Sequence, residues 1–401
     1  MQQNTPRSER LHIGIFGATN AGKSSLMNCL LGQQVAITSP IHGTTTDTVY
    51  KNIEIIGIGP CTIMDTPGWN DNTPLQEQRM LSTRQAIAKT DIALCLISKN
   101  DTQHSMQTWT GLLGTQVKVI YIINHHTPLP TNLQPNTGRT PESPIHINCH
   151  TKEGIETLLQ CIKNIARTKL NTAEQNDLTG TLTQPGDTVV LVMPQDASAP
   201  QGRLIMPQVQ TIRHLLDKGC NAICTTPQNL THCLQNLNTP PTLIITDSQV
   251  FAQVENLTPA NTRLTSFSIL QACQKGDVKA FLQGAKTLLS LPPNAHILIA
   301  EACSHTPQHE DIGRVKLPAM LRKKLGDQLH IDHVAGNDFP ADLTPYNLVI
   351  HCGACLFTRT HVLNRISQTQ QQNIPITNYG IAIAALTGIL DKVSLPTSER
   401  Q

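Results

Sequence analysis

Three cysteines and two histidines near the end of the chain have the spacing of a metal site. They form two short runs, Cys303-Ser304-His305 and His351-Cys352-Gly353-Ala354-Cys355. The Cys-x-x-Cys pair puts two thiolates within reach of one metal centre, and Cys303 joins them if the fold brings its loop alongside. A lone Cys-x-x-Cys also serves redox dithiol chemistry, and single cysteines are often simply buried. The third cysteine and the flanking histidines favour a metal.

Ligand types alone are compatible with two kinds of centre. Zinc would take His305 or His351 as a fourth ligand in tetrahedral geometry. An iron–sulfur cluster on three cysteines leaves one iron for a histidine, a carboxylate or an outside molecule. The Cys-x-x-x-Cys-x-x-Cys run of radical S-adenosylmethionine enzymes is absent from the sequence.

Composition limits the class of protein. The 401 residues suggest two to four domains, and the hydrophobic content of 39% is enough for real cores, although aromatic residues make up only 3%. A formal net charge of +2 gives no electrostatic reason to expect a nucleic-acid or membrane partner. The polar start, Met1 to Arg10, lacks the apolar core of a signal peptide. With 12 cysteines and no export signal, we expect a soluble cytoplasmic protein with reduced thiols.

A phosphate-binding loop lies near the start of the chain. The run from Gly17 to Ser24 is Gly-x-x-x-x-Gly-Lys-Ser, between an apolar strand and a helical pattern. Its backbone N–H groups and the helix N-terminus would surround phosphate oxygens. Lys23 would reach the terminal phosphates and Ser24 would bind Mg²⁺. The nucleotide-binding residues predicted here are Gly17, Asn20, Ala21, Gly22, Lys23, Ser24 and Ser25.

Two further motifs follow at the distances that a nucleotide hydrolase needs. One of Thr44, Thr45 and Thr46, with Thr45 as our prediction, would bind Mg²⁺ from a switch loop. A second strand ends in Asp65-Thr66-Pro67-Gly68, where Asp65 would hold the metal shell and the Gly68 amide would sense a γ-phosphate.

This stretch resembles the small G domains of the tRNA-modification and Era-like GTPases. In that resemblance, Asn20 lies where some members hold a potassium ion, so that Asn20 joins Lys23 as a catalytic residue. Guanine is normally read by Asn-Lys-x-Asp, and here Asn124 is kept while Thr127 replaces the aspartate. Asn148-Cys149-His150 stands in place of the usual Ser-Ala-Lys loop. GTP is the expected nucleotide, and its selectivity over other nucleotides is left open.

The rest of the chain indicates two smaller α/β domains. We predict a G domain over 1–170, a linker over 171–183, an α/β interaction or dimerisation domain over 184–260 and a metal-binding α/β domain over 261–401. A stretch over 264–289 is expected to be mostly helical. Strands at 296–300 and 348–350 deliver Cys303 and Cys352 at their carboxyl ends, where α/β sheets usually build sites. Cys220, Cys224 and Cys233 are expected to be ordinary buried thiols.

Together the two halves resemble the HydF family of FeFe-hydrogenase maturation GTPases. Beyond the cysteine–histidine pattern, the resemblance includes the runs 199–205, 264–270 and 311–314. It implies a 4Fe–4S cluster on Cys303, Cys352 and Cys355, with His305, His351 or Glu301 as the possible fourth ligand. It also implies a homodimer formed through the middle domain. Such a scaffold receives a di-iron precursor from two radical-SAM maturases, HydE and HydG, and passes it to apo FeFe-hydrogenase.

Two alternatives stay open. One is a tRNA-modifying or ribosome-associated GTPase with a structural zinc site, against which stands the near-neutral charge. The other is a general iron–sulfur electron carrier, which would have no need of a phosphate-binding loop.

Overall fold

The computed structural model describes residues 6–32, 35–41, 48–68, 76–114, 116–129, 143–174, 177–195, 202, 204–302 and 311–396. The chain divides into two compact units, Met1–Glu174 and Gln175–Gln401. Three of the predicted site residues, Thr45, Cys303 and His305, lie outside the described ranges.

The first unit is built on a seven-stranded sheet, in the order β2-β3-β4-β1-β5-β6-β7 among the described residues. Its strands are β1 (Leu11–Gly17), β2 (Val35–Ile41), β3 (Val49–Ile55), β4 (Gly59–Asp65), β5 (Ile92–Leu96), β6 (Lys118–Asn124) and β7 (Ile145–Ile147). The pairs from β4 through β1 to β7 are parallel, whereas β2–β3 and β3–β4 are antiparallel. This confirms the predicted P-loop α/β fold class.

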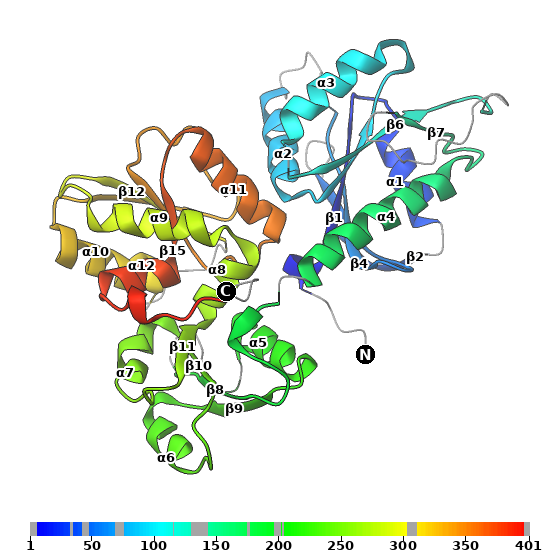
Figure 1. Ribbon diagram of the computed structural model, residues 1–401. Helices are drawn as coiled ribbons and strands as arrows, with labels where there is room; N and C mark the ends of the chain where they lie inside the picture. Colours follow the sequence, from blue (N-terminus) through cyan, green and yellow to red (C-terminus); the bar gives the residue numbers. More distant parts are fainter. Residues whose placement is uncertain are drawn as a thin grey trace. The chain divides into compact units, whose positions relative to one another are not determined.

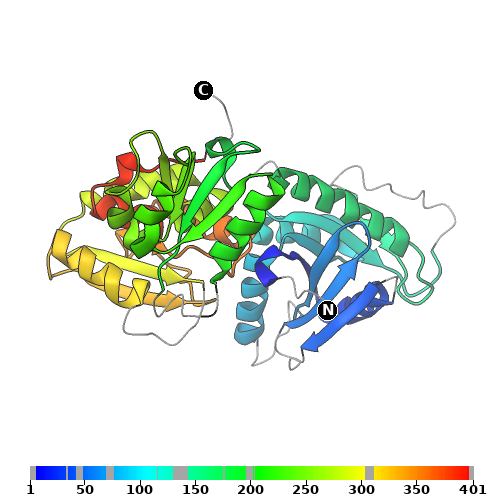
Figure 2. The same cartoon turned by 90° about the horizontal axis from the view of Figure 1, so that it is seen from below.

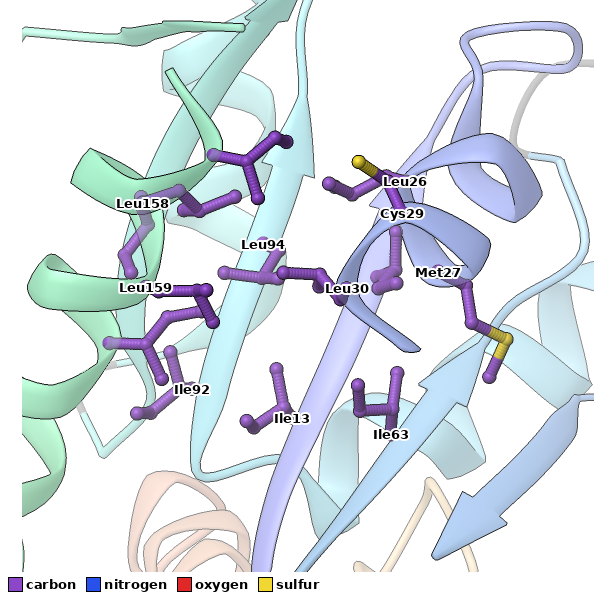
Figure 3. Close-up of a cluster of buried hydrophobic side chains, with 14 of the residues drawn as sticks. Ile13, Leu26, Met27, Cys29, Leu30, Ile63, Ile92, Leu94, Leu158 and Leu159 are labelled. Carbon is purple, nitrogen blue, oxygen red and sulfur yellow. The ribbon is translucent and has the colours of Figure 1, made fainter. Parts of the chain in front are cut away.

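In the described part of this unit, four helices cover the two faces of the sheet: α1 (Lys23–Leu31), α2 (Gln76–Lys89), α3 (Thr102–Leu113) and α4 (Ile155–Glu174). Figure 1 shows α1 and α4 on one side and α2 and α3 on the other, and Figure 2 shows α4 as one long helix along the sheet. Leu30 of α1 and Leu158 of α4 meet Leu94 of the sheet in the core of the first face (Figure 3). On the second face, Phe16 packs against Trp109 of α3, with ring centroids 5.6 Å apart.

The second unit contains two four-stranded parallel sheets within the described chain. One has the order β11-β10-β8-β9 and the other β13-β12-β14-β15. Their strands are β8 (Thr188–Val192), β9 (Asn221–Thr225), β10 (Leu243–Thr246), β11 (Arg263–Ser266), β12 (His296–Glu301), β13 (His330–Ala335), β14 (Leu348–His351) and β15 (Ile376–Asn378). The first of these sheets extends to Ser266, whereas the sequence analysis divided the chain at residue 260.

Eight helices pack on these two sheets in the described residues: α5 (Met206–Asp217), α6 (Leu230–Gln235), α7 (Phe251–Glu255), α8 (Phe267–Lys275), α9 (Val278–Leu289), α10 (Leu317–Leu325), α11 (Arg359–Gln371) and α12 (Tyr379–Leu386). Helix α8 joins the two sheets, because Phe267 and Leu270 lie in the core of the first and Ile269 in the core of the second. Helix α12 is apolar on all sides and is accordingly buried from Tyr379 to Ala385.

The two sheets of the second unit have the same topology. In chain order, each places its strands as 2-1-3-4, all parallel. In each, the first strand is followed by a Gly-Arg-x-x-x-Pro run, at 202–207 and 313–318, and the helix begins one residue before the proline. In each, the fourth strand ends on the side chain that caps the next helix, Ser266 for α8 and Asn378 for α12. The chain order reverses beside the first strand, which is where such folds bind ligands.

Candidate functional sites

The phosphate-binding loop is closed around the side chain of Lys23. The loop leaves β1 at Gly17 and enters α1 after Gly22, whose φ of 92° favours glycine, while Asn20 also has a positive φ of 62°. Lys23 is buried, and its Nζ donates to the carbonyl oxygens of Gly17 at 3.1 Å and Ala18 at 2.7 Å. The predicted loop geometry is therefore present, with the ammonium group pointing into it.

A pair of oxygen ligands lies beside this loop. The Ser24 hydroxyl donates to Asp65 Oδ2 at 2.7 Å. The other carboxylate oxygen of Asp65 is buried and has no hydrogen-bond partner within the described ranges. Burial raises the pKa of Asp65, while Ser24 and Lys23 oppose that effect. Mg²⁺ prefers oxygen ligands. The Ser24 hydroxyl and the Asp65 carboxylate, which has one oxygen without a hydrogen bond in the described structure, therefore fit this ion.

The segment after Asp65 is fastened to the loop. The Thr66 hydroxyl donates to the carbonyl oxygen of Ile15 at 2.7 Å. Gly68 lies against Thr19, and a Cβ at Gly68 would come within 2.0 Å of the Thr19 hydroxyl oxygen and 2.8 Å of its Cα. Only glycine permits this approach, which places the Gly68 amide next to the phosphate-binding loop. Of the other predicted residues here, Ala21 is half-buried and Ser25 is exposed on the first turn of α1.

Asn124 connects the phosphate loop to the base-recognition end. It terminates β6, and a Cβ at Gly22 would lie 2.5 Å from its amide nitrogen. Its Oδ1 accepts the backbone N–H of Cys149 at 3.3 Å. Thr127 presents an exposed side chain, so the structure supplies no replacement for the missing aspartate at that position.

Asn148 is a positioning residue that the sequence analysis did not single out. Its side chain is only 1% exposed. Its Nδ2 donates to the carbonyl oxygen of Thr127 at 2.8 Å, and its Oδ1 accepts the N–H groups of His150 at 2.8 Å and Thr151 at 3.1 Å. It thereby ties together the two loops that would surround a base. The signal available in the sequence was an asparagine directly after a strand, in the place of the usual Ser-Ala-Lys loop.

The cysteine site is organised by two adjacent parallel strands, as predicted. β12 pairs with β14 in the register Ala300 to His351, so that both strands end at the same edge of the sheet. The Cys352 sulfur accepts the backbone N–H of Ala302 at 3.0 Å and that of Ala354 at 3.4 Å. Ala302 is the last described residue before Cys303, so the chain that leads to Cys303 contacts the Cys352 sulfur.

The donor set fits a thiolate-bound metal. N–H groups directed at a cysteine sulfur are a feature of iron–sulfur ligation. Burial raises the pKa of Cys355, and Lys275 and nearby backbone N–H groups oppose that effect. Within the described ranges, no three His, Cys, Asp or Glu side chains form a metal-binding group; Cys303 falls outside those ranges.

The candidate ligands His351 and Glu301 both have their polar atoms engaged. His351 Nε2 is 2.9 Å from Arg365 Nη1 and must accept, because arginine can only donate. His351 Nδ1 therefore carries the proton and donates to the carbonyl oxygen of Cys352 at 2.8 Å. Burial lowers the pKa of this histidine to about 3.

Glu301 is 4% exposed and accepts from Arg314 Nε at 3.0 Å and from the Tyr379 hydroxyl at 3.2 Å. Of the two cations on the segment that leads into α10, Arg314 is thus paired with Glu301, and Lys316 donates to Gln249 at 2.8 Å. His351 would have to give up its hydrogen bond from Arg365 before it could bind a metal, whereas a metal at Glu301 would compete with Arg314 and Tyr379 for the carboxylate.

The other cysteines in the described chain are free thiols. Cys220 is buried and Cys233 half-buried, as expected, whereas Cys224 is exposed, so the prediction of burial is wrong for that residue. Its strand, β9, is an edge strand of its sheet.

No helix of the described residues combines the length and the apolarity needed to cross a bilayer.

Comparison with curated proteins finds relatives of the first unit. The mitochondrial 5-taurinomethyluridine tRNA synthase subunit GTPB3 of Danio rerio is 30% identical over 186 residues, covering 40% of this chain and 37% of that protein. The tRNA modification GTPase MnmE of Nitrosomonas europaea is 31% identical over 176 residues, covering 43% of this chain and 38% of that protein. The chain thus spans less than two fifths of these relatives. A solved structure of Aquifex aeolicus Era bound to GDP.AlF4- is 18% identical with a TM-score of 0.31, covering 54% of this chain and 92% of that one.

Family models cover most of the chain. The 50S ribosome-binding GTPase model matches residues 12–125, so the first unit is a GTPase domain. The hydrogen maturase F dimerization domain matches 178–276, and the hydrogen maturase F tetramerization domain matches 279–396. The latter two matches divide the second unit after α8 and account for nearly all of it. With a GTPase domain followed by both of these domains in order, the chain belongs to the hydrogen maturase F (HydF) family, the hydrogenase-maturation GTPases.

Proposed function

We propose that this protein is a GTP-hydrolysing scaffold that binds a 4Fe–4S cluster and a di-iron precursor and delivers the precursor to apo FeFe-hydrogenase. The observation that carries the proposal is the meeting of β12 and β14 at one sheet edge, where the N–H of Ala302 reaches the Cys352 sulfur. This edge lies where the strand order reverses, the usual ligand position of parallel α/β sheets.

The nucleotide chemistry rests on Lys23, Ser24 and Asp65. Lys23 would exchange its two carbonyl partners for the terminal phosphate oxygens of GTP. Ser24 and Asp65 would hold Mg²⁺, which neutralises charge on the β- and γ-phosphates. Thr45 completes this ligand set in the proposal, and Asn20 holds a potassium ion that serves in place of an arginine finger. The Gly68 amide, held against the loop, reports whether the γ-phosphate is present.

Cys303, Cys352 and Cys355 would hold the cluster. A cluster with three cysteine ligands supplies one exchangeable iron position, which suits a site that must load and release an iron unit. Because His351 and Glu301 are already hydrogen-bonded to Arg365, Arg314 and Tyr379, we place His305 or an outside ligand at the fourth position.

The partners follow from the same proposal. The chain would receive its di-iron unit from HydE and HydG, dimerise through residues 178–276 and associate further through residues 279–396. We expect the protein to act in a reducing compartment such as the cytoplasm, where cysteine thiols bind metals rather than form disulfides.

Metal analysis after anaerobic purification tests the cluster. Iron and acid-labile sulfide should be present at about four of each per chain. They should be lost in Cys352→Ser and kept in Cys224→Ser, whose thiol is exposed on β9. Stoichiometric zinc without sulfide would instead support a tRNA-modifying GTPase with a structural metal.

Two functional assays separate the remaining alternatives. The loaded protein should transfer iron to apo FeFe-hydrogenase. If no iron is transferred, the result would support the alternative that the protein is a general electron carrier. GTP hydrolysis should be faster in potassium than in sodium and should be abolished in Lys23→Met. Binding of GTP, ATP and XTP to the same preparation measures how selective the site is for guanine when Thr127 replaces the usual aspartate.

A further inference from the structure

A buried lysine lies directly behind the loop that carries the paired cysteines. Lys275 is the last residue of α8 and is 7% exposed. Its Nζ donates to three backbone carbonyl oxygens of that loop, those of Ala354 at 3.0 Å, Cys355 at 3.3 Å and Phe357 at 3.0 Å. One ammonium group therefore holds most of the turn between Cys352 and Phe357, including Ala354 at a positive φ of 53°.

A buried arginine supports the same loop from another helix. Arg365 of α11 is 4% exposed, and its guanidinium carbon lies 4.6 Å from the ring centres of both Phe339 and Phe357. It donates to His351 Nε2 and to the carbonyl oxygen of Gly336. These partners are all uncharged. A buried cation with only neutral partners is costly unless an anion lies nearby.

The cysteine pair can supply that anion, because Arg365 hydrogen-bonds to His351, the residue before Cys352, and Lys275 hydrogen-bonds to the backbone of Cys355. Attraction to Cys352 raises the pKa of Arg365, although burial, the larger effect, lowers it to about 10. Lys275 Nζ donates to the carbonyl oxygen of Cys355 itself at 3.3 Å, and its attraction lowers the pKa of that thiol against the larger effect of burial. Each buried cation is thus coupled to one of the two thiols, and His351 connects Arg365 to the Cys352 peptide through its second ring nitrogen.

We propose that Lys275 and Arg365 are the built-in counter-cations of the cysteine-bound cluster, and that they set its reduction potential as well as the shape of its loop. The inference rests on the cluster proposed above. A cluster gains negative charge on reduction, so fixed positive charge behind it stabilises the reduced form and raises the potential. Removing either charge should lower the potential.

The experiment measures the potential of the full-length protein by EPR-monitored redox titration after anaerobic reconstitution. In Lys275→Met and in Arg365→Met, the ratio of oxidised to reduced cluster at a fixed potential should rise at least tenfold. For a one-electron couple, a tenfold rise corresponds to a reduction potential that is 59 mV lower. Lys279→Met and Arg322→Met, at exposed positions on α9 and α10, are the matched controls and should leave the potential unchanged. Iron and sulfide per chain are measured in every sample.

The charge-preserving variants Lys275→Arg and Arg365→Lys separate charge from shape. They should keep the cluster at its wild-type potential, including in the case where the methionine variants fail to retain iron. The proposal is overturned if loaded methionine variants titrate within twofold of wild type, or if the charge-preserving variants lose the cluster together with the methionine variants. A wild-type protein without iron and sulfide would overturn the proposed function itself, which is a different result.

Discussion

Replacing Asn148 by alanine should loosen both loops at the base end of the nucleotide site. The side chain is 1% exposed and makes three hydrogen bonds to backbone groups of Thr127, His150 and Thr151. Each neutral hydrogen bond contributes about 1 kcal/mol net, so Asn148→Ala should destabilise the first unit by about 3 kcal/mol. For a unit of this size that corresponds to a melting temperature lower by roughly 6–12 °C.

The thermal unfolding of the full chain, with and without saturating GDP, measures this effect. The transition that GDP shifts belongs to the first unit, because ligand binding stabilises the folded form of the domain that binds it. Calorimetric titration with GDP gives the affinity. If about 1.4 kcal/mol of the loss falls on the loops that contact the base, the Kd should rise about tenfold.

Two further variants make the test specific. Asn148→Asp keeps the acceptor for His150 and Thr151 but sets a carboxylate oxygen against the carbonyl of Thr127. It should therefore weaken GDP binding and destabilise the first unit at least as much as Asn148→Ala, because it buries a charge that faces a carbonyl oxygen. Asn164→Ala removes an exposed side chain of α4 that contacts only Gln160 among the described residues, and should change neither quantity. An Asn148→Ala protein that melts within about 1 °C of wild type with unchanged GDP affinity would refute the role assigned to this side chain.

Three shorter predictions test other parts of the structure. Gly68→Ala should slow GTP hydrolysis at least tenfold while GDP affinity changes less than threefold, since the new Cβ would lie 2.8 Å from a backbone carbon of the phosphate loop; single-turnover assays and GDP titration measure the two. His125 Nε2 and His146 Nδ1 are 2.8 Å apart, a contact that needs one neutral acceptor, and burial lowers the pKa of both. The first unit should therefore lose stability as the pH falls below about 6.5, where the unfolded chain takes up protons first, and His146→Gln should flatten this dependence in melting curves between pH 8 and 5. Gly284→Ala would place a Cβ 2.1 Å from the carbonyl oxygen of Ile376, so it should destabilise the second unit by about 3 kcal/mol and leave the GDP-shifted transition in place.

Those parts of the protein that depend on local sequence could be predicted from it. The phosphate loop is a contiguous motif between a strand and a helix, and in the structure Lys23 points into this loop while Ser24 hydrogen-bonds to Asp65 beside it. The meeting of Cys352 with the chain before Cys303 was also predictable, because apolar runs preceded both and parallel strands share a carboxyl edge.

Other features depend on partners far along the chain. The stretch over 264–289 is mostly helical, as expected, because it contains α8 and α9, but its first three residues belong to β11 (Arg263–Ser266). Leu264 and Phe267 are three residues apart, as on one face of a helix, but the pairing of β11 with β10 outweighs that local pattern. Lys275 and Arg365 read in the sequence as ordinary charged residues at the ends or faces of helices. Their role comes from backbone carbonyls and rings that only the tertiary fold brings to them.

The two sheets of the second unit separate what topology provides from what side chains provide. Both have the strand order 2-1-3-4 and a Gly-Arg-x-x-x-Pro run after the first strand, so both offer the same position at the ends of strands 1 and 3. In the first sheet, strand 3 is followed by Asp247, which accepts a hydrogen bond from Gln208 at 3.0 Å, so polar side chains of the protein lie at this position. In the second sheet, strand 3 is followed by Cys352, whose sulfur accepts two N–H groups, with buried cations behind its loop. Because the backbone frame is the same in both, the metal chemistry proposed for one of them must come from the thiols and their counter-charges.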